Sequence, residues 1–73
     1  METSEIIQDP RFRRAVLAGE YTRSISVFLR LQYPAVEDLS TLPRDVIQGA
    51  QVAVDNAFFD REKVRKEMEK EMR

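Results

Sequence analysis

Residues 21–34 read YTRSISVFLRLQYP, and the conformation of this segment decides the fold of the chain. At helical spacing, Ile25, Phe28 and Leu29 belong to one apolar face. At a spacing of two, apolar and polar side chains alternate with Phe28 as the one exception, which is typical of a strand. No second segment reads as a strand, and a single strand would leave its backbone groups unpaired. We therefore favour a helix that ends before the proline, since the residue preceding a proline is pushed out of the helical region.

A short helix is expected before this segment. Asp9 is a good N-cap, and Pro10 suits the first helical position because its missing N–H would be unpaired there anyway. Gly19 is expected to end this helix, since glycine readily adopts the left-handed conformation that closes many helices. Residues 1–9 carry no strong pattern and are expected to form a loose lead-in, with two isoleucines available to pack.

A long helix is expected after the segment. A connector comes first, with room for one helical turn at 35–39. Ser40 or Thr41 is expected to cap the long helix, whose apolar spacing begins at Leu42 and continues for about thirty residues. Most residues from 60 to 73 are charged, so this part is expected to be a solvated helical tail that frays at its end.

These elements predict an all-α fold, namely a small three-helix domain with a long C-terminal helix and a charged, frayed tail. A chain of 73 residues can form one domain, spanning 1–73, in which the first two helices pack against the long one. The predicted core consists of apolar residues that recur at helical spacing: Phe12, Val16, Ile25, Phe28, Leu29, Ile47, Val54 and Phe58.

The residue types that most catalytic and metal sites need are missing. The sequence has no cysteine and no histidine, which excludes disulfides, histidine- or thiolate-based catalysis, and the usual nitrogen and sulfur metal ligands. Two glycines, at 19 and 49, are too few for a phosphate-binding loop. We expect a protein that is not an enzyme and holds no cofactor and no metal. Because so short a chain has a thin core, a homodimer or a partner is the expected source of further stability.

The sequence also indicates a location. No apolar segment approaches the roughly 20 residues needed to cross a bilayer. The first residues, METSE, are acidic and lack the basic-then-apolar pattern of a signal peptide. The absence of cysteine fits a reducing compartment. We therefore expect a cytoplasmic protein with no membrane contact.

Opposite charges are concentrated in different parts of the chain. Residues 11–30 hold five arginines and one glutamate, a net charge of +4, whereas residues 34–60 hold five acidic residues and one arginine, a net charge of −4. The two segments can pair with each other or steer a partner. Arginine favours bidentate contacts with carboxylates and phosphates, so the arginines of the basic segment are predicted to contact a partner: Arg11, Arg13, Arg14, Arg23 and Arg30. On a helix Arg11 and Arg14 share a face, whereas Arg13 points elsewhere. The alternative is a solvated face that pairs partly with Glu37, Asp45 or Asp55.

Apolar residues near the C-terminus are further candidates for a partner-binding surface: Phe59, Val64 and Met68. Phe58 and Phe59 are adjacent and about 100° apart on a helix, so one is expected to face the core and the other a dimer or partner interface. Val64, Met68 and Met72 recur every four residues. They form either a docking stripe or a helix end that packs weakly on its own domain.

Residues 23–31 resemble the start of a ribbon-helix-helix repressor, in which a short strand pairs across a dimer and reads DNA. In that family a full helix follows the strand, whereas here Pro34 and Pro43 leave room only for a turn at 35–39. A helix-turn-helix hypothesis has three helical segments available, but the connector after Tyr33 is long for its tight turn.

The function that these features favour is binding to a protein partner. We expect a small regulatory or inhibitory protein, of the kind often encoded by small open reading frames in bacteria or their phages. The competing hypothesis is a dimeric DNA-binding repressor of ribbon-helix-helix or helix-turn-helix type. A net charge of −1 makes nucleic acid the less favoured partner, since DNA-binding domains usually carry a net basic excess.

Overall fold

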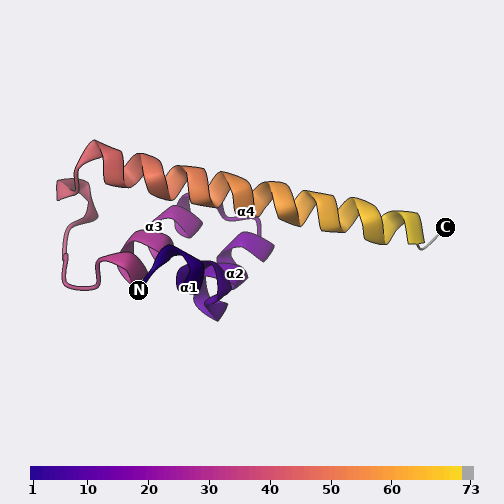
Figure 1. The fold of residues 1–73 in the computed structure, drawn as a ribbon, viewed down its shortest axis with the longest axis horizontal. Helices are drawn as coiled ribbons and strands as arrows, with labels where there is room; N and C mark the ends of the chain where they lie inside the picture. Colours follow the sequence, from indigo (N-terminus) through magenta and orange to yellow (C-terminus); the bar gives the residue numbers. More distant parts are fainter. Residues whose placement is uncertain (72–73) are drawn as a thin grey trace.

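The described residues form four α-helices and one short 3-10 helix, and three of the α-helices lie on the same side of the fourth (Figure 1). The computed structural model describes the backbone of residues 1–71 and the side chains of residues 1–63 and of Lys66. In chain order the elements are α1 (Thr3–Gln8), α2 (Pro10–Leu17), α3 (Tyr21–Gln32), the 3-10 helix η1 (Leu39–Thr41) and α4 (Arg44–Glu71). The predicted all-α fold with a long C-terminal helix is confirmed.

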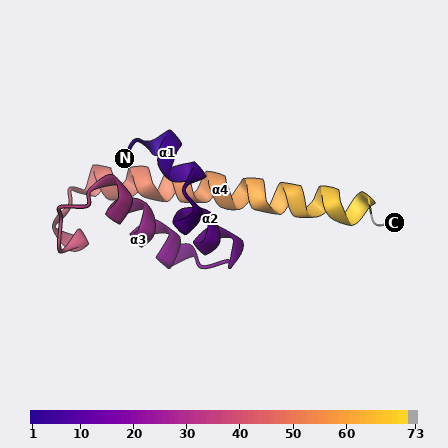
Figure 2. The same cartoon turned by 90° about the horizontal axis from the view of Figure 1, so that it is seen from below.

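Helix α4 extends well beyond the body formed by the other helices. It has 28 residues and is therefore about 42 Å long. The molecule measures 48 × 20 × 18 Å, and its radius of gyration is 13.6 Å, whereas a compact chain of this length has about 11 Å. The C-terminal half of α4 projects past α1, α2 and α3 in both views (Figures 1 and 2). The predicted tail at 60–73 continues α4 through Glu71, and its last two residues lie outside the described part. None of the described helices combines the length and apolarity needed to cross a membrane.

Helices α2 and α3 begin and end close to the predicted residues. The side chain of Asp9 accepts a hydrogen bond of 2.8 Å from the backbone N–H of Arg11 and so caps α2, with proline as the first helical residue. Gly19 has a φ of 75° in the turn that follows. Helix α3 continues to Gln32, so the ambiguous segment is helical. The ribbon-helix-helix hypothesis loses the strand on which it depends.

The prediction of a loose lead-in at residues 1–9 is wrong. Residues Thr3–Gln8 form α1, and the described residues therefore form four α-helices where three were predicted. A helix of six residues is marginal by itself, because so few hydrogen bonds do not offset the cost of starting a helix. Ile6 is fully buried against the core, and we infer that this burial stabilises α1.

The start of α4 also differs from the prediction. Ser40 and Thr41 do not cap α4, because both belong to η1. Asp38 caps η1 instead: its Oδ1 accepts hydrogen bonds from the Ser40 backbone N–H at 3.0 Å and from the Ser40 hydroxyl at 2.6 Å. The helical turn expected at 35–39 lies slightly later in the chain, and α4 begins at Arg44.

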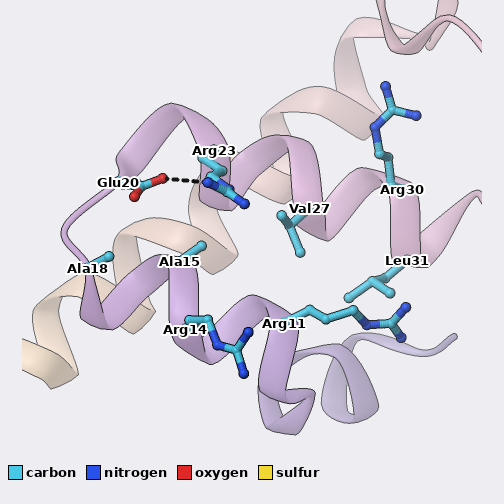
Figure 3. Close-up of a pocket in the computed structure, with 9 residues that line it drawn as sticks. All are labelled: Arg11, Arg14, Ala15, Ala18, Glu20, Arg23, Val27, Arg30 and Leu31. Atoms are coloured by element: carbon cyan, nitrogen blue, oxygen red, sulfur yellow. Dashed lines mark hydrogen bonds and ion pairs between the residues drawn. The ribbon is translucent and has the colours of Figure 1, made fainter.

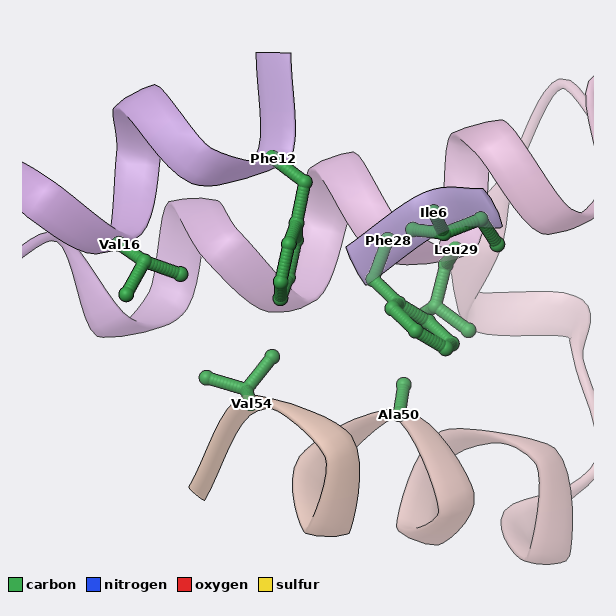
Figure 4. Packing of buried hydrophobic residues seen from close by; sticks show 7 residues of the cluster. All are labelled: Ile6, Phe12, Val16, Phe28, Leu29, Ala50 and Val54. Atoms are coloured by element: carbon green, nitrogen blue, oxygen red, sulfur yellow. The ribbon is translucent and has the colours of Figure 1, made fainter. Parts of the chain in front are cut away.

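A thin core lies between α4 and the three shorter helices (Figure 4). The rings of Phe12 and Phe28 meet edge to face, with their centroids 5.8 Å apart. Ala50 and Val54 line the side of α4 that faces these rings. The buried cluster consists of Ile6, Phe12, Val16, Phe28, Leu29, Ala50 and Val54.

Most of the predicted core is confirmed. Its buried members are Phe12, Val16, Phe28, Leu29 and Val54. The other predicted members, Ile25, Ile47 and Phe58, are half-buried and pack against this cluster. The prediction omitted Ile6, Ala15 and Ala50, which are all buried.

The two glycines should respond in opposite directions to the same substitution. The space that a Cβ at Gly49 would occupy is empty, and its φ is not positive, so Gly49→Ala should stabilise the protein by about 0.4–1 kcal/mol. Gly19 has a φ of 75°, so Gly19→Ala should destabilise it by about 1–2 kcal/mol. Urea denaturation followed by helical circular dichroism measures both. A shift of the same sign in the two variants would contradict the assigned backbone conformations.

Candidate functional site

An open groove runs between the outer faces of α2 and α3 (Figure 3). Its volume is about 560 Å3. Small and apolar side chains form its floor, among them Ala15 from α2 and Val27 and Leu31 from α3. Four arginines border it, Arg11 and Arg14 from α2 and Arg23 and Arg30 from α3. The fold thus brings together four of the five arginines predicted to contact a partner.

Helical spacing and one tight turn place these arginines. Arg11 and Arg14 are three residues apart, so they share one side of α2 as predicted. Arg23, Val27 and Arg30 are separated by four and three residues, so they share one side of α3. The turn at residues 18–20 folds α3 back against α2. In Figure 3 the side chains of Val27 and Leu31 point into the space between the helices, while the guanidinium group of Arg30 points away from α2.

Two of the four groove arginines have ion-pair partners within the chain. Arg11 donates two hydrogen bonds of 3.0 Å to the two carboxylate oxygens of Asp9. Arg23 lies 3.4 Å from a carboxylate oxygen of Glu20. Both arginine side chains are about two-thirds exposed, at 68% and 69%, so solvent weakens these pairs. No carboxylate among the described side chains forms an ion pair with Arg14 or Arg30.

The basic and acidic segments form no ion pair with each other through the described side chains. The partial pairing with Glu37, Asp45 or Asp55 that the alternative included is therefore wrong for this part of the chain, whereas its other component, a solvated face, is not contradicted. Asp55 instead accepts a hydrogen bond of 2.7 Å from the hydroxyl of Tyr21. This bond links the start of α3 to α4, and it raises the pKa of Tyr21 because it stabilises the protonated hydroxyl.

The groove offers cationic hydrogen-bond donors and apolar surface, and its one lining carboxylate belongs to Glu20. Such a surface can bind a ligand that carries both anionic and apolar groups. Among the described side chains, no group of three or more carboxylates lies close enough together to hold a metal ion.

The other predicted site residues lie away from the groove. Arg13 borders a hollow between α2 and α4, beside Leu17 and Arg61. Phe58 packs edge to face on Tyr21, with the ring centroids 5.7 Å apart, whereas Phe59 is 70% exposed. The expectation that one of these adjacent rings faces the core is therefore confirmed for Phe58, whereas a dimer or partner interface at Phe59 stays a prediction. The side chains of Val64 and Met68, the remaining candidates, lie outside the described ones.

The apolar floor of the groove was not predicted from the sequence. Val27 and Leu31 are four residues apart in α3, so helical spacing places them on one side. That spacing could have identified them, but the apolar face assigned to this helix was the one around Phe28, which packs into the core. The contribution of Ala15 could not be found in this way, because it depends on how α2 lies against α3.

The ion pair formed by Asp9 and Arg11 should make the stability of the protein depend on pH in the acidic range. The Arg11 hydrogen bond lowers the pKa of Asp9 below its ordinary value of 3.8. Because the folded pKa is the lower one, the stabilising effect is complete above pH 3.8 and is lost as the pH falls through the folded value. Asp9→Asn keeps a capping oxygen but removes the charge. The urea concentration at its unfolding midpoint should therefore fall less than that of the wild type when the pH is lowered from about 6 to about 2.5.

Glu37→Gln provides the matched control, since Glu37 forms no ion pair with a described side chain. This variant should lose as much stability in acid as the wild type does. Equal losses in the Asp9→Asn variant and the wild type would show that Asp9 contributes nothing to the acid response.

Similarity to known proteins does not assist the assignment of a function. No family model matches the chain, and the comparisons with curated proteins and with solved structures found no match either.

Proposed function

We propose that the protein is a non-catalytic regulator that binds an acidic amphipathic helix of a partner protein in the groove between α2 and α3. The observation that carries this proposal is an apolar floor bordered by arginines from two helices. Val27 and Leu31 are half-buried, so part of their surface remains available to a ligand. Binding would cover the partner's helix and so block or modulate its other contacts.

The shape and charge of the groove suit such a helix. An amphipathic helix carries an apolar stripe along one side and polar residues on its flanks. When the stripe lies on Val27 and Leu31, glutamates on the flanks come within reach of the arginines of both groove helices. Arg14 and Arg30 belong to different helices, and neither forms an ion pair with a described side chain. Each can therefore donate hydrogen bonds to a carboxylate of the partner without breaking an ion pair with a described side chain.

The apolar floor and the arginines contribute in different ways. An exposed ion pair between arginine and a carboxylate contributes about 0.2–1 kcal/mol, so charge alone gives weak binding. Apolar burial contributes roughly 25 cal/mol per Å2, so the floor supplies much of the affinity. The arginines mainly orient the helix and speed its approach.

Two observations favour a protein ligand over nucleic acid. The floor of the groove is apolar, so an amphipathic helix can bury its apolar stripe there, whereas a phosphate backbone gains nothing from such a floor. The net charge of −1 also opposes non-specific attraction to DNA.

One observation supports a second candidate function, DNA binding by a helix-turn-helix. Helices α2 and α3 are joined by three residues with Gly19 at their centre, as in that motif. The tight turn was sought after Tyr33 in the sequence, whereas this turn lies one helix earlier. In this alternative α3 would enter the major groove and present Arg23 and Arg30 to DNA.

A synthetic acidic peptide tests the proposed function. The probe has about 18 residues, with leucine and alanine on one helical face and glutamate on the flanks. We expect a Kd on the order of 10 µM by fluorescence anisotropy at physiological salt, since the groove is short. The double variant Arg14→Glu and Arg30→Glu should raise this Kd at least about tenfold, because it removes one cation from each side of the groove and repels the ligand.

The double variant Arg13→Glu and Arg44→Glu is the matched control, since it changes the net charge by the same amount away from the groove. It should raise the Kd less than about threefold, an effect of long-range charge alone. Equal weakening in the two double variants would contradict groove binding. A random DNA duplex that binds more tightly than the peptide, with a steep dependence on salt, would favour the second candidate.

A further inference from the structure

The outward face of α4 has no cover among the described residues. Val52 is 59% exposed and Phe59 is 70% exposed. They are seven residues apart, about two helical turns, so they lie on the same side of the helix. Ala50, which is buried in the core, is nine positions from Phe59 and so lies about 180° around the helix axis from it. Helices α1, α2 and α3 all lie on the opposite side of α4 (Figure 1).

Two charged residues continue the same seven-residue spacing on either side of this apolar pair. Asp45, Val52, Phe59 and Lys66 follow one another at intervals of seven residues, and both charged residues are exposed. A repeat of seven drifts only about 20° per repeat around a straight helix, so the four residues form one stripe. From the N-terminal to the C-terminal end, this stripe carries an acid, two apolar groups and a base.

The order of these residues makes the stripe complementary to itself in one orientation. When two copies of α4 lie antiparallel, Asp45 of one faces Lys66 of the other, and Val52 faces Phe59. Each contact then occurs twice, as two-fold symmetry requires. A parallel arrangement would bring the two Asp45 carboxylates together, and also the two Lys66 ammonium groups, which is unfavourable.

We propose that a second copy of this chain packs on the outward face of α4 in antiparallel orientation, giving a two-fold symmetric dimer. The stripe from Asp45 to Lys66 is about 32 Å long. A contact of that length and one helix wide is small for a protein interface, so the dimer is weak and reversible. No residue of α4 lines the groove between α2 and α3, so that groove stays open in the dimer.

Sedimentation equilibrium of the full chain tests this dimer, with circular dichroism as the check on folding. The wild type should dimerise with a Kd on the order of 100 µM at physiological salt. Phe59→Glu should raise the Kd at least about tenfold, because it places a charge opposite Val52. Leu17→Glu is the matched control, since Leu17 is 65% exposed but lies on α2. This control should leave the Kd within about twofold of the wild type.

A charge exchange tests the antiparallel register. Asp45→Lys and Lys66→Asp should each raise the Kd about fivefold, since each puts like charges together at both ends of the dimer. The double variant should restore the wild-type Kd within about twofold, because it re-forms both pairs with their signs exchanged. A wild type that stays monomeric at about 1 mM overturns the proposal. A Leu17→Glu variant whose dimer Kd rises as much as that of Phe59→Glu also overturns it. A double variant whose dimer Kd is no lower than those of the single variants overturns it too.

Discussion

The edge-to-face contact between Phe12 and Phe28 fixes how α2 lies against α3, and the outer surface of both helices depends on it. The two ring centroids are 5.8 Å apart in the core. The tight turn at Gly19 joins the end of α2 to the start of α3. Two large rings hold the inner sides of α2 and α3 together. The outer sides of the two helices face solvent, and smaller residues lie between these outer sides. The groove and its arginines are a consequence of this packing.

The thin core explains why so much surface of the described part remains uncovered. Seven buried apolar side chains form the core cluster, and α1, α2 and α3 together cover only one side of α4. Without cysteine or histidine, no disulfide and no histidine-held metal can supplement this core. The surfaces left over are an arginine-bordered groove on α2 and α3 and a self-complementary stripe on α4. They lie on different helices.

Two features of the fold that depend on local interactions were predicted correctly from the sequence. The cap at Asp9 and the stop at Gly19 were both identified, because each depends on a few neighbouring residues. Helix α1 was missed because its stability derives from the burial of Ile6 against distant residues. The expected cap from Ser40 failed because Asp38 accepts both the backbone N–H and the hydroxyl of that residue. The arginines were named from the sequence, but the apolar floor between them requires the tertiary contact of α2 with α3.

The central claim is that the groove binds its ligand at a defined place and does not merely attract negative charge. Intermolecular nuclear Overhauser effects between the methyl groups of an acidic amphipathic peptide and those of the protein test this claim most directly. We predict contacts from the peptide leucines to Val27 and Leu31, and none to Val52 on α4. A peptide that shifts the arginine resonances but shows no contact with Val27 or Leu31 would contradict it.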